Sequence, residues 1–252
     1  MNMVNFVRFL AGLPDDVAQD ATLGDQAQHG AVLMAVDNTV SSPGNPGDMD
    51  SAFFNEASTA VSQSLVAMGY STLPNTVKAW VSETAGSILP RRRWILNPQM
   101  QYTGLGFCNG SSAFADMMAL DTSRAATVSY DYTAWPGGEA FPVQFFSSTS
   151  PWSVTLNPSR YQAPVAAAIT VAMRRASDGK VWILNSTDTN TSGPYLAVDN
   201  SPAGVGNCIM FLADSAVTIS AGDQYTVLVA GLKKADGSDT SIYYTVNFFD
   251  LP

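Results

Sequence analysis

The chain has 252 residues and a formal net charge of −9; 46% of its residues are apolar and only 13% are charged. This balance excludes an intrinsically disordered chain, and the length predicts one or two domains with ample material for a buried core. The 12 lysines and arginines provide no positive field that could hold a phosphate backbone, so nucleic acid and anionic membrane surfaces are poor candidate partners.

The first 90 or so residues follow a helical pattern. Within 17–37, four apolar side chains recur at helical spacing and predict one buried face: Leu23, Ala27, Ala31 and Met34. Residues 41–48 contain two prolines and two glycines and predict a loop. A short helix over about 50–57 and a second over about 74–84 follow, and Pro74 fits the first turn of the second helix.

After Pro90 the apolar pattern changes to a period of about two, which is typical of strands. The first expected strands are 94–96, 102–108 and 113–120. From about residue 126 onward the pattern indicates only strands, at 127–134, 143–146, 152–156, 166–174, 181–184, 195–198, 208–212, 216–219, 224–230 and 242–249. The pair Asp178-Gly179 predicts a two-residue hairpin turn.

The change of pattern along the chain predicts an α+β fold in two domains. Residues 1–124 form the helix-rich domain, and 125–252 form an all-β, immunoglobulin-like antiparallel sandwich of short strands. In the last strand, alternation places four apolar residues on one face: Ile242, Tyr244, Val246 and Phe248. Trp135 and Trp152 are interpreted as core residues rather than as an exposed platform for sugars.

The two cysteines make neither a disulfide framework nor a metal cluster. Cys108 and Cys208 each lie in a strand-like run, which favours two buried free thiols, although one bridge stays possible. Residues 1–14 contain no long apolar run and do not read as a signal peptide, so a cytosolic protein and one whose signal segment has been removed both stay open. No stretch approaches the roughly 18–20 apolar residues of a membrane-spanning helix.

The single histidine, His29, lies nearly opposite the apolar stripe of its predicted helix. We expect it to be exposed or at the edge of the helix rather than a catalytic residue or a ligand. A serine-histidine triad would have to use this residue, and no G-x-S-x-G motif is present. A phosphate-binding G-x-x-x-x-G-K motif is also missing from the sequence.

Five motifs carry a family resemblance. They are Arg8-Phe9-Leu10-Ala11-Gly12-Leu13-Pro14, the helix Ala27 to Ala35, Ala79-Trp80-Val81-Ser82-Glu83, Arg92-Arg93-Trp94-Ile95-Leu96-Asn97-Pro98, and Thr103-Gly104-Leu105-Gly106-Phe107. In order and spacing they resemble bacterial CAP-domain proteins, the superfamily of cysteine-rich secretory proteins, antigen 5 and pathogenesis-related-1 proteins. The resemblance covers about 4–122 and implies a three-layer α-β-α sandwich for 1–124 and an extracellular location.

The C-terminal half also has a likeness. The stretch Tyr130 to Pro136 and the ending Tyr243 to Phe249 resemble the β-domain that often follows a CAP domain in secreted Gram-positive proteins. The resemblance therefore implies a CAP-like domain followed by a β-sandwich.

The sequence departs from the family at the cleft where many members carry two histidines and two acidic residues. Ser42 stands at the position of the first histidine and Arg91 at that of the second, while Ser62 to Leu65 supplies no acid. Only Glu83 of the Trp-x-x-Glu motif is kept. Because a zinc site needs three or four converging ligands and acid–base catalysis needs its imidazole, we expect no catalytic residue, no metal ligand and no cofactor there.

Four residues are therefore candidates for lining a degenerate ligand cleft: Ser42, Glu83, Arg91 and Arg92. The arginine run 91–93 is interpreted either as an anion clamp or, preferably, as the start of a strand whose guanidinium groups point into water or pair with acids. We hypothesise that Arg91 points at Glu83, so that an ion pair replaces the lost metal site.

The leading hypothesis is a secreted, non-catalytic CAP-like module that binds an extracellular lipid, glycan or peptide or serves a structural role. The alternative is a hydrolase of cell-wall peptide or glycan that uses Glu83 with a second carboxylate from Asp48, Asp50 or Glu56. An adhesion or spacer protein, in which the β half is the working part, is a third possibility.

Overall fold

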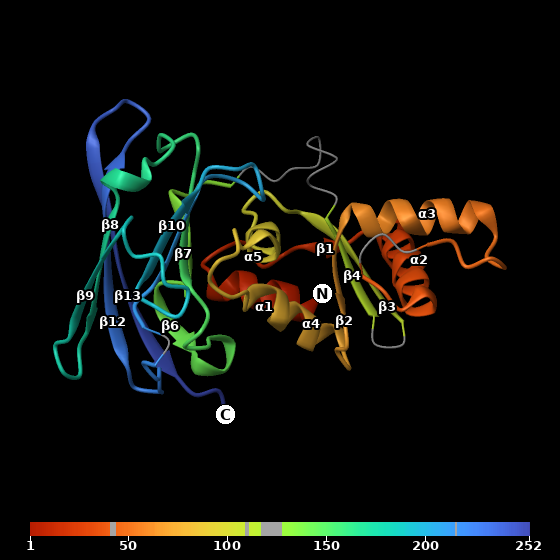
Figure 1. Cartoon of the computed structure of the whole chain (residues 1–252), viewed down its shortest axis with the longest axis horizontal. Coiled ribbons are helices and arrows are strands. Elements are labelled where there is room, and N and C mark those ends of the chain that lie inside the picture. The colour runs from red at the N-terminus through yellow and green to blue at the C-terminus, as the bar shows by residue number, and fades with distance from the viewer. Residues whose placement is uncertain (41–43, 109–110, 117–127, 215) are drawn as a thin grey trace. The chain divides into compact units, whose positions relative to one another are not determined.

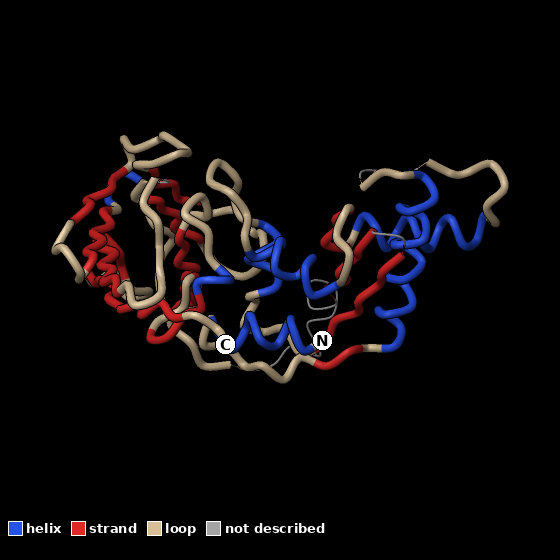
Figure 2. Tube along the Cα trace, turned by 90° about the horizontal axis from the view of Figure 1, so that it is seen from below, coloured by secondary structure: helices blue, strands red, loops and turns tan. Residues whose placement is uncertain are grey.

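The computed structural model describes residues 1–40, 44–108, 128–214 and 216–252, together with the backbone of 111–116. The chain forms two compact units, each assembled from separate stretches of sequence. The first unit consists of Met1–Val7, Pro14–Val81 and Gln99–Val128. The second unit consists of Arg8–Leu13, Ser82–Pro98 and Ser129–Pro252. The first unit combines helices with a sheet, and strands predominate in the second, as the colours of Figure 2 show.

The first unit contains a four-stranded sheet in the order β1-β3-β4-β2. β1 pairs with β3 in parallel, and the other two pairings are antiparallel. Helices α2 and α3 lie on one face of this sheet and α4 on the other, which makes an α-β-α arrangement (Figure 1). The elements that belong to this unit wholly or in part are α1 (Asn2–Leu10), β1 (Ala18–Gln19), α2 (Ala21–Asp37), α3 (Ser51–Ser62), β2 (Ser64–Met68), α4 (Leu73–Val81), β3 (Tyr102–Cys108) and β4 (Ser111–Asp116).

Helix α2 is the long predicted helix, and local chemistry sets both of its ends. The Asp20 carboxylate accepts a hydrogen bond from the N–H of Leu23 at 3.0 Å and caps the N-terminus. Asn38 ends the helix in the left-handed region with φ 51°. The predicted apolar stripe is confirmed, since its four residues are all buried: Leu23, Ala27, Ala31 and Met34.

Strand β3 meets α2 through two glycines, which lets the helix backbone lie directly on the strand. A Cβ atom at Gly104 would be 2.1 Å from the carbonyl carbon of Leu23. A Cβ atom at Gly106 would be 2.1 Å from the carbonyl oxygen of Ala27. The Gly-x-Gly spacing of this strand is therefore a packing requirement, because side chains two residues apart point to the same face.

The second unit is built mainly of two sheets, in the orders β10-β11-β7-β5 and β6-β13-β12-β8-β9. All of their pairings are antiparallel except β13 with β6. Its elements are α5 (Pro90–Ile95), β5 (Tyr132–Trp135), β6 (Glu139–Pro142), η3 (Val143–Phe145), β7 (Trp152–Leu156), η4 (Ala166–Ala168), β8 (Thr170–Arg175), β9 (Val181–Asn185), β10 (Tyr195–Asp199), β11 (Cys208–Leu212), β12 (Gln224–Lys233) and β13 (Asp239–Phe249). The α+β class and the β-rich C-terminal region are confirmed.

Aromatic side chains fill the core of the second unit. Trp135 and Trp152 are 1% and 2% exposed, so the prediction that they are core residues is confirmed. The Trp135 ring packs edge-on against Phe141, and the Trp152 ring packs edge-on against Phe248. The predicted inward face of the last strand is confirmed as well, because its four apolar residues are buried: Ile242, Tyr244, Val246 and Phe248.

Three predicted strands are wrong. Trp94 and Ile95 are the last residues of helix α5, which starts at Pro90, and Leu96 is its C-cap. Residues 143–145 form a 3₁₀ turn after Pro142. Residues 216–219, all of them described, contain no strand. The three runs are short and apolar, and short apolar runs do not separate helix from strand by periodicity.

Other elements were missed or only partly matched. The expected strand over 113–120 corresponds to β4, and its residues from 117 onward lie outside the described part. The short strands β1, β2 and β6 were not predicted, because they are too brief or too evenly half-buried to show alternation. The hairpin at Asp178-Gly179 is present between β8 and β9, with Gly179 at φ 71°.

The two compact units are not separated by a single boundary in the sequence. The predicted boundary at 124/125 lies within the residues left undescribed. The segments Arg8–Leu13 and Ser82–Pro98, both N-terminal to that boundary, pack in the second unit. Both cysteines are free thiols; Cys208 is buried as predicted, whereas Cys108 is only half-buried.

Candidate functional site

Glu83, the one acid kept from the family motif, caps a helix inside the second unit. It lies just after α4, and its carboxylate reaches the first turn of α5. One oxygen (Oε2) accepts a hydrogen bond from the backbone N–H of Arg92 at 3.0 Å, and the other (Oε1) lies 3.5 Å from Nη1 of Arg91. Because Leu89 at the N-cap has no side chain that can accept, Glu83 supplies the capping oxygen that α5 lacks locally.

The electrostatics of Glu83 are dominated by burial, since the residue is only 9% exposed. Burial raises the pKa of Glu83 above its ordinary value. The hydrogen bond from the Arg92 N–H and the guanidinium charges of Arg92 and Arg91 act in the opposite direction and offset only part of that increase in pKa.

Arg92 is buried and holds its own segment against strand β7 and the loop before it. Its Nη1 donates to the carbonyl oxygen of Pro151 at 2.7 Å and to the hydroxyl of Ser153 at 3.1 Å. The hydroxyl of Ser150 donates to the carbonyl oxygen of Glu83 at 3.2 Å. Burial lowers the pKa of Arg92 to about 10, so the guanidinium stays charged at neutral pH.

Arg93 makes a second set of contacts within the same unit. Its Nη1 pairs with the carboxylate of Asp199, and its Nη2 donates to the carbonyl oxygens of Ser201 and Gly206, at 2.9 Å each. Sequence reasoning did not single out Arg93. Its place in the charge run was the only signal, because Asp199 lies more than a hundred residues further along the chain.

The structure brings together three of the four predicted cleft residues. Glu83, Arg91 and Arg92 form one cluster, and the hypothesised Arg91–Glu83 ion pair is present. Ser42 lies outside the described residues. The arginine run is a helix rather than the expected start of a strand. Of its three guanidinium groups only that of Arg91 is exposed.

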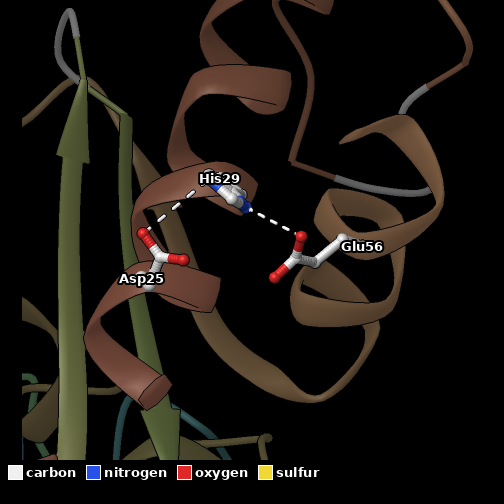
Figure 3. Close-up of side chains that lie close together, drawn as sticks. All are labelled: Asp25, His29 and Glu56. Carbon is white, nitrogen blue, oxygen red and sulfur yellow. Dashed lines mark ion pairs between the residues drawn. The ribbon is translucent and has the colours of Figure 1, made fainter. Parts of the chain in front are cut away.

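A second cluster of polar groups lies in the first unit, between α2 and α3 (Figure 3). His29 Nδ1 is 3.3 Å from Oε2 of Glu56, and His29 Nε2 is 3.8 Å from Oδ1 of Asp25. The imidazole is about three-quarters buried and packs against the Phe53 ring with centroids 4.6 Å apart. The expectation that His29 sits at the edge of the helix fits this position, but the two acids beside it were not foreseen.

These three side chains offer donor atoms of the types that bind divalent metals. One atom from each residue can be chosen so that all three lie within 4.8 Å of one another. Among the described residues, this is the one group of three or more histidine, cysteine or acidic side chains that could hold a metal ion. The Asp25–His29 spacing of four residues was readable in the sequence, whereas Glu56 comes from another helix.

The first unit also has an apolar cavity of about 360 Å³ at the start of α1. Its lining consists of Met1 and of residues from α1, α4 and β3, and Asn2 is its one polar residue: Asn2, Met3, Val4, Leu73, Pro74, Val77 and Leu105. This volume is within the range of about 300–1,000 Å³ found for small-molecule sites, and the lining suits apolar groups.

The first unit has the α-β-α arrangement that the family resemblance implies, and the C-terminal region is rich in strands (Figure 1). The model of the CAP family, described as the cysteine-rich secretory protein family, matches residues 1–119. The match confirms the CAP part of the resemblance drawn from the sequence motifs, over residues 1–119; the likeness to the bacterial branch and to its C-terminal β-domain stays a prediction. Comparisons with curated proteins and with solved structures found no match. Among the described residues, no helix is both long enough and apolar enough to cross a membrane.

Proposed function

We propose that the protein is a secreted CAP-like module with a degenerate cleft, which binds an extracellular ligand or serves a structural role without catalysing a reaction. The family match supports the module type, and secretion is common in that family. The observation that carries the proposal is the engagement of Glu83, the last acid of the family motif, in a helix cap and an ion pair.

The contacts of Glu83 disfavour a catalytic role. A general acid or base must come within hydrogen-bonding reach of the substrate proton. The side chain of Glu83 is 7% exposed, and its two oxygens face the N–H of Arg92 and the guanidinium of Arg91. The raised pKa is in the direction that a general acid needs, but the carboxylate is directed at protein groups.

The alternative function, a cell-wall hydrolase, needs a second carboxylate within about 5–9 Å of the first. Of the candidates Asp48, Asp50 and Glu56, two are already engaged by groups of the first unit. Asp50 accepts hydrogen bonds from the N–H groups of Ala52 and Phe53 as the cap of α3, and Glu56 faces His29. The hydrolase is therefore the less favoured function.

An activity assay tests the non-catalytic part of the proposal. The purified 252-residue protein and its Glu83→Gln variant are incubated with dye-labelled peptidoglycan and with a fluorogenic peptide panel. We expect neither protein to release dye above the buffer control. Release by the wild type that the variant loses would overturn the proposal in favour of the hydrolase.

The cavity in the first unit is the proposed binding surface, and its lining favours an apolar ligand over a glycan. We expect a fluorescent fatty acid to bind to the wild type and to bind at least about threefold more weakly to Leu73→Gln, because the amide places a polar group in the lining. Ile88→Gln, at an exposed apolar residue of the second unit, serves as the matched control. Equal binding by all three proteins would remove the cavity from the proposal.

A further inference from the structure

We propose that Asp25, His29 and Glu56 form a binding site for a divalent transition metal of the zinc class. None of the three residues is among those that the family resemblance assigns to its cleft, where Ser42, Glu83 and Arg91 stand.

The donor set has the composition that zinc and its neighbours accept. One imidazole nitrogen and two carboxylate oxygens are typical ligands, at about 2.0–2.2 Å from the metal. At those bond lengths, two ligands of a tetrahedral ion lie about 3.3 Å apart, and His29 Nδ1 is 3.3 Å from Glu56 Oε2. The Asp25 carboxylate is mostly exposed and lies 3.8 Å from the other ring nitrogen, and one donor atom from each of the three residues lies within 4.8 Å of the other two.

The backbone holds two of the ligands in fixed relation. Asp25 and His29 are four residues apart on α2, which places them one turn apart on the same helix face. Glu56 projects from α3 towards the same ring (Figure 3). The two helices approach closely beside His29, because a Cβ atom at Gly30 would lie 3.3 Å from the side chain of Val61. Phe53 packs on the imidazole and limits its rotation.

The local charge favours a cation. Among the described residues, neither Asp25 nor Glu56 forms an ion pair with a lysine or an arginine, and both carboxylates face His29. His29 Nδ1 is buried and lacks a well-aligned hydrogen bond in spite of the nearby carboxylate. Two carboxylates and one imidazole leave at least one coordination position for water or a ligand around a four-coordinate ion.

The competing explanation for the cluster is a protonated His29 that bridges two carboxylates without any metal. The two explanations differ in what added zinc does. A metal site binds one equivalent of zinc in a saturable way, with an imidazole nitrogen of His29 as a ligand. If the cluster is instead a protonated His29 between two carboxylates, no saturable binding of zinc is expected, because zinc would have to displace the proton.

The test is isothermal titration calorimetry, in which zinc chloride is added to the chelator-treated 252-residue protein. The protein carries Cys108→Ser, which removes the half-buried thiol. We expect binding of one equivalent, and a loss of affinity of at least tenfold in His29→Ala and in Glu56→Gln. Asp48→Asn, an exposed acid in the same unit, is the matched control and should keep the affinity of the background protein.

A spectroscopic measurement keeps the proposal falsifiable if a variant fails to fold. The chain has one histidine, so its imidazole signals in an NMR spectrum belong to His29 without further assignment. Added cobalt(II) should shift or broaden these signals at one equivalent. Unchanged imidazole signals, or zinc affinity equal in His29→Ala and the background protein, would overturn the proposed site.

Discussion

At the scale of single residues, Arg92 is a buried and closely held charge of the second unit. Its buried guanidinium donates hydrogen bonds to the carbonyl oxygen of Pro151 and to the hydroxyl of Ser153. Its backbone N–H donates a hydrogen bond to the carboxylate of Glu83. Removing one partner from a buried charged network leaves the others desolvated and unpaired, which is costly. The arginine run is therefore an internal anchor of this unit rather than an exposed anion clamp.

Substitution of Arg92 tests this role. We expect Arg92→Ala to lower the free energy of unfolding of the second unit by about 3–5 kcal/mol. Arg174→Ala, at an exposed arginine on β8, should stay within about 0.5 kcal/mol of the wild type. Urea unfolding followed by tryptophan fluorescence measures both variants. A loss in Arg92→Ala no larger than that in Arg174→Ala would contradict the anchoring role.

Glu83 gives a second prediction, because burial raises its pKa in the folded state. Between the ordinary glutamate value and the raised one, the folded state binds more protons than the unfolded state, so the contribution of Glu83 to stability falls as pH rises through this window. Glu83→Gln cannot ionise and lacks this dependence. The free energy of unfolding of the variant minus that of the wild type should therefore increase with pH across the window and level off above it.

Denaturation in urea at a series of pH values from 4 to 8 measures this difference, with Glu139→Gln as the exposed control. A difference that decreases with rising pH would mean that the attraction of Arg91 and Arg92 outweighs the desolvation of the carboxylate.

At the scale of secondary-structure elements, the contact of α2 with β3 depends on glycine. We expect Gly106→Ala to destabilise the first unit by about 1–3 kcal/mol, because its methyl group would overlap the carbonyl oxygen of Ala27. Gly47→Ala is the matched control, since a Cβ atom there meets no atom within 4 Å. Thermal unfolding distinguishes the two, and equal melting temperatures would show that helix and strand can move apart without cost.

The elements that the sequence predicted are those with a long periodic pattern. Helix α2 and strand β13 each bury one continuous face. Their apolar residues therefore recur with periods of 3.6 and 2, which can be recognised in the sequence. Helix α5 escaped prediction because its cap is not local: the oxygen that begins it comes from Glu83, before the helix and outside its own turn. The short strands β1 and β6 form only because they pair with strands distant in the sequence, β3 and β13 respectively.

The candidate sites divide in the same way. The pairing of Glu83 with Arg91 followed from one exchange within a recognised motif, and the Asp25–His29 pair follows from helical spacing. The position of Glu56 beside His29, and of Asp199 beside Arg93, depends on how separate elements pack. The local pattern of residue types does not show how distant elements pack, so neither Glu56 nor Asp199 could be identified as a partner from one sequence.

At the scale of the whole molecule, the second unit depends on residues that a simple cut at 124/125 would remove. The segment Ser82–Pro98 supplies Arg92 and Arg93, whose donors satisfy carbonyls of the β-rich region. A linear division into two independent domains would leave those buried acceptors without their partners, and unsatisfied buried acceptors destabilise a fold.

Two fragments test this dependence. We expect 82–252 to unfold at a higher urea concentration than 125–252, because only the longer fragment keeps the Arg92 contacts to Pro151 and Ser153 and the Arg93 pair with Asp199. The Arg92→Ala form of 82–252 is the control: it should lose part of this advantage, which separates the effect of the anchoring contacts from that of chain length. Equal midpoints for 82–252 and 125–252 would instead establish the C-terminal half as a self-sufficient domain and confine the arginine run to the CAP-like region. A higher urea midpoint for the longer fragment means that the segment around Glu83, although it lies in the CAP-like region, stabilises the β-rich unit.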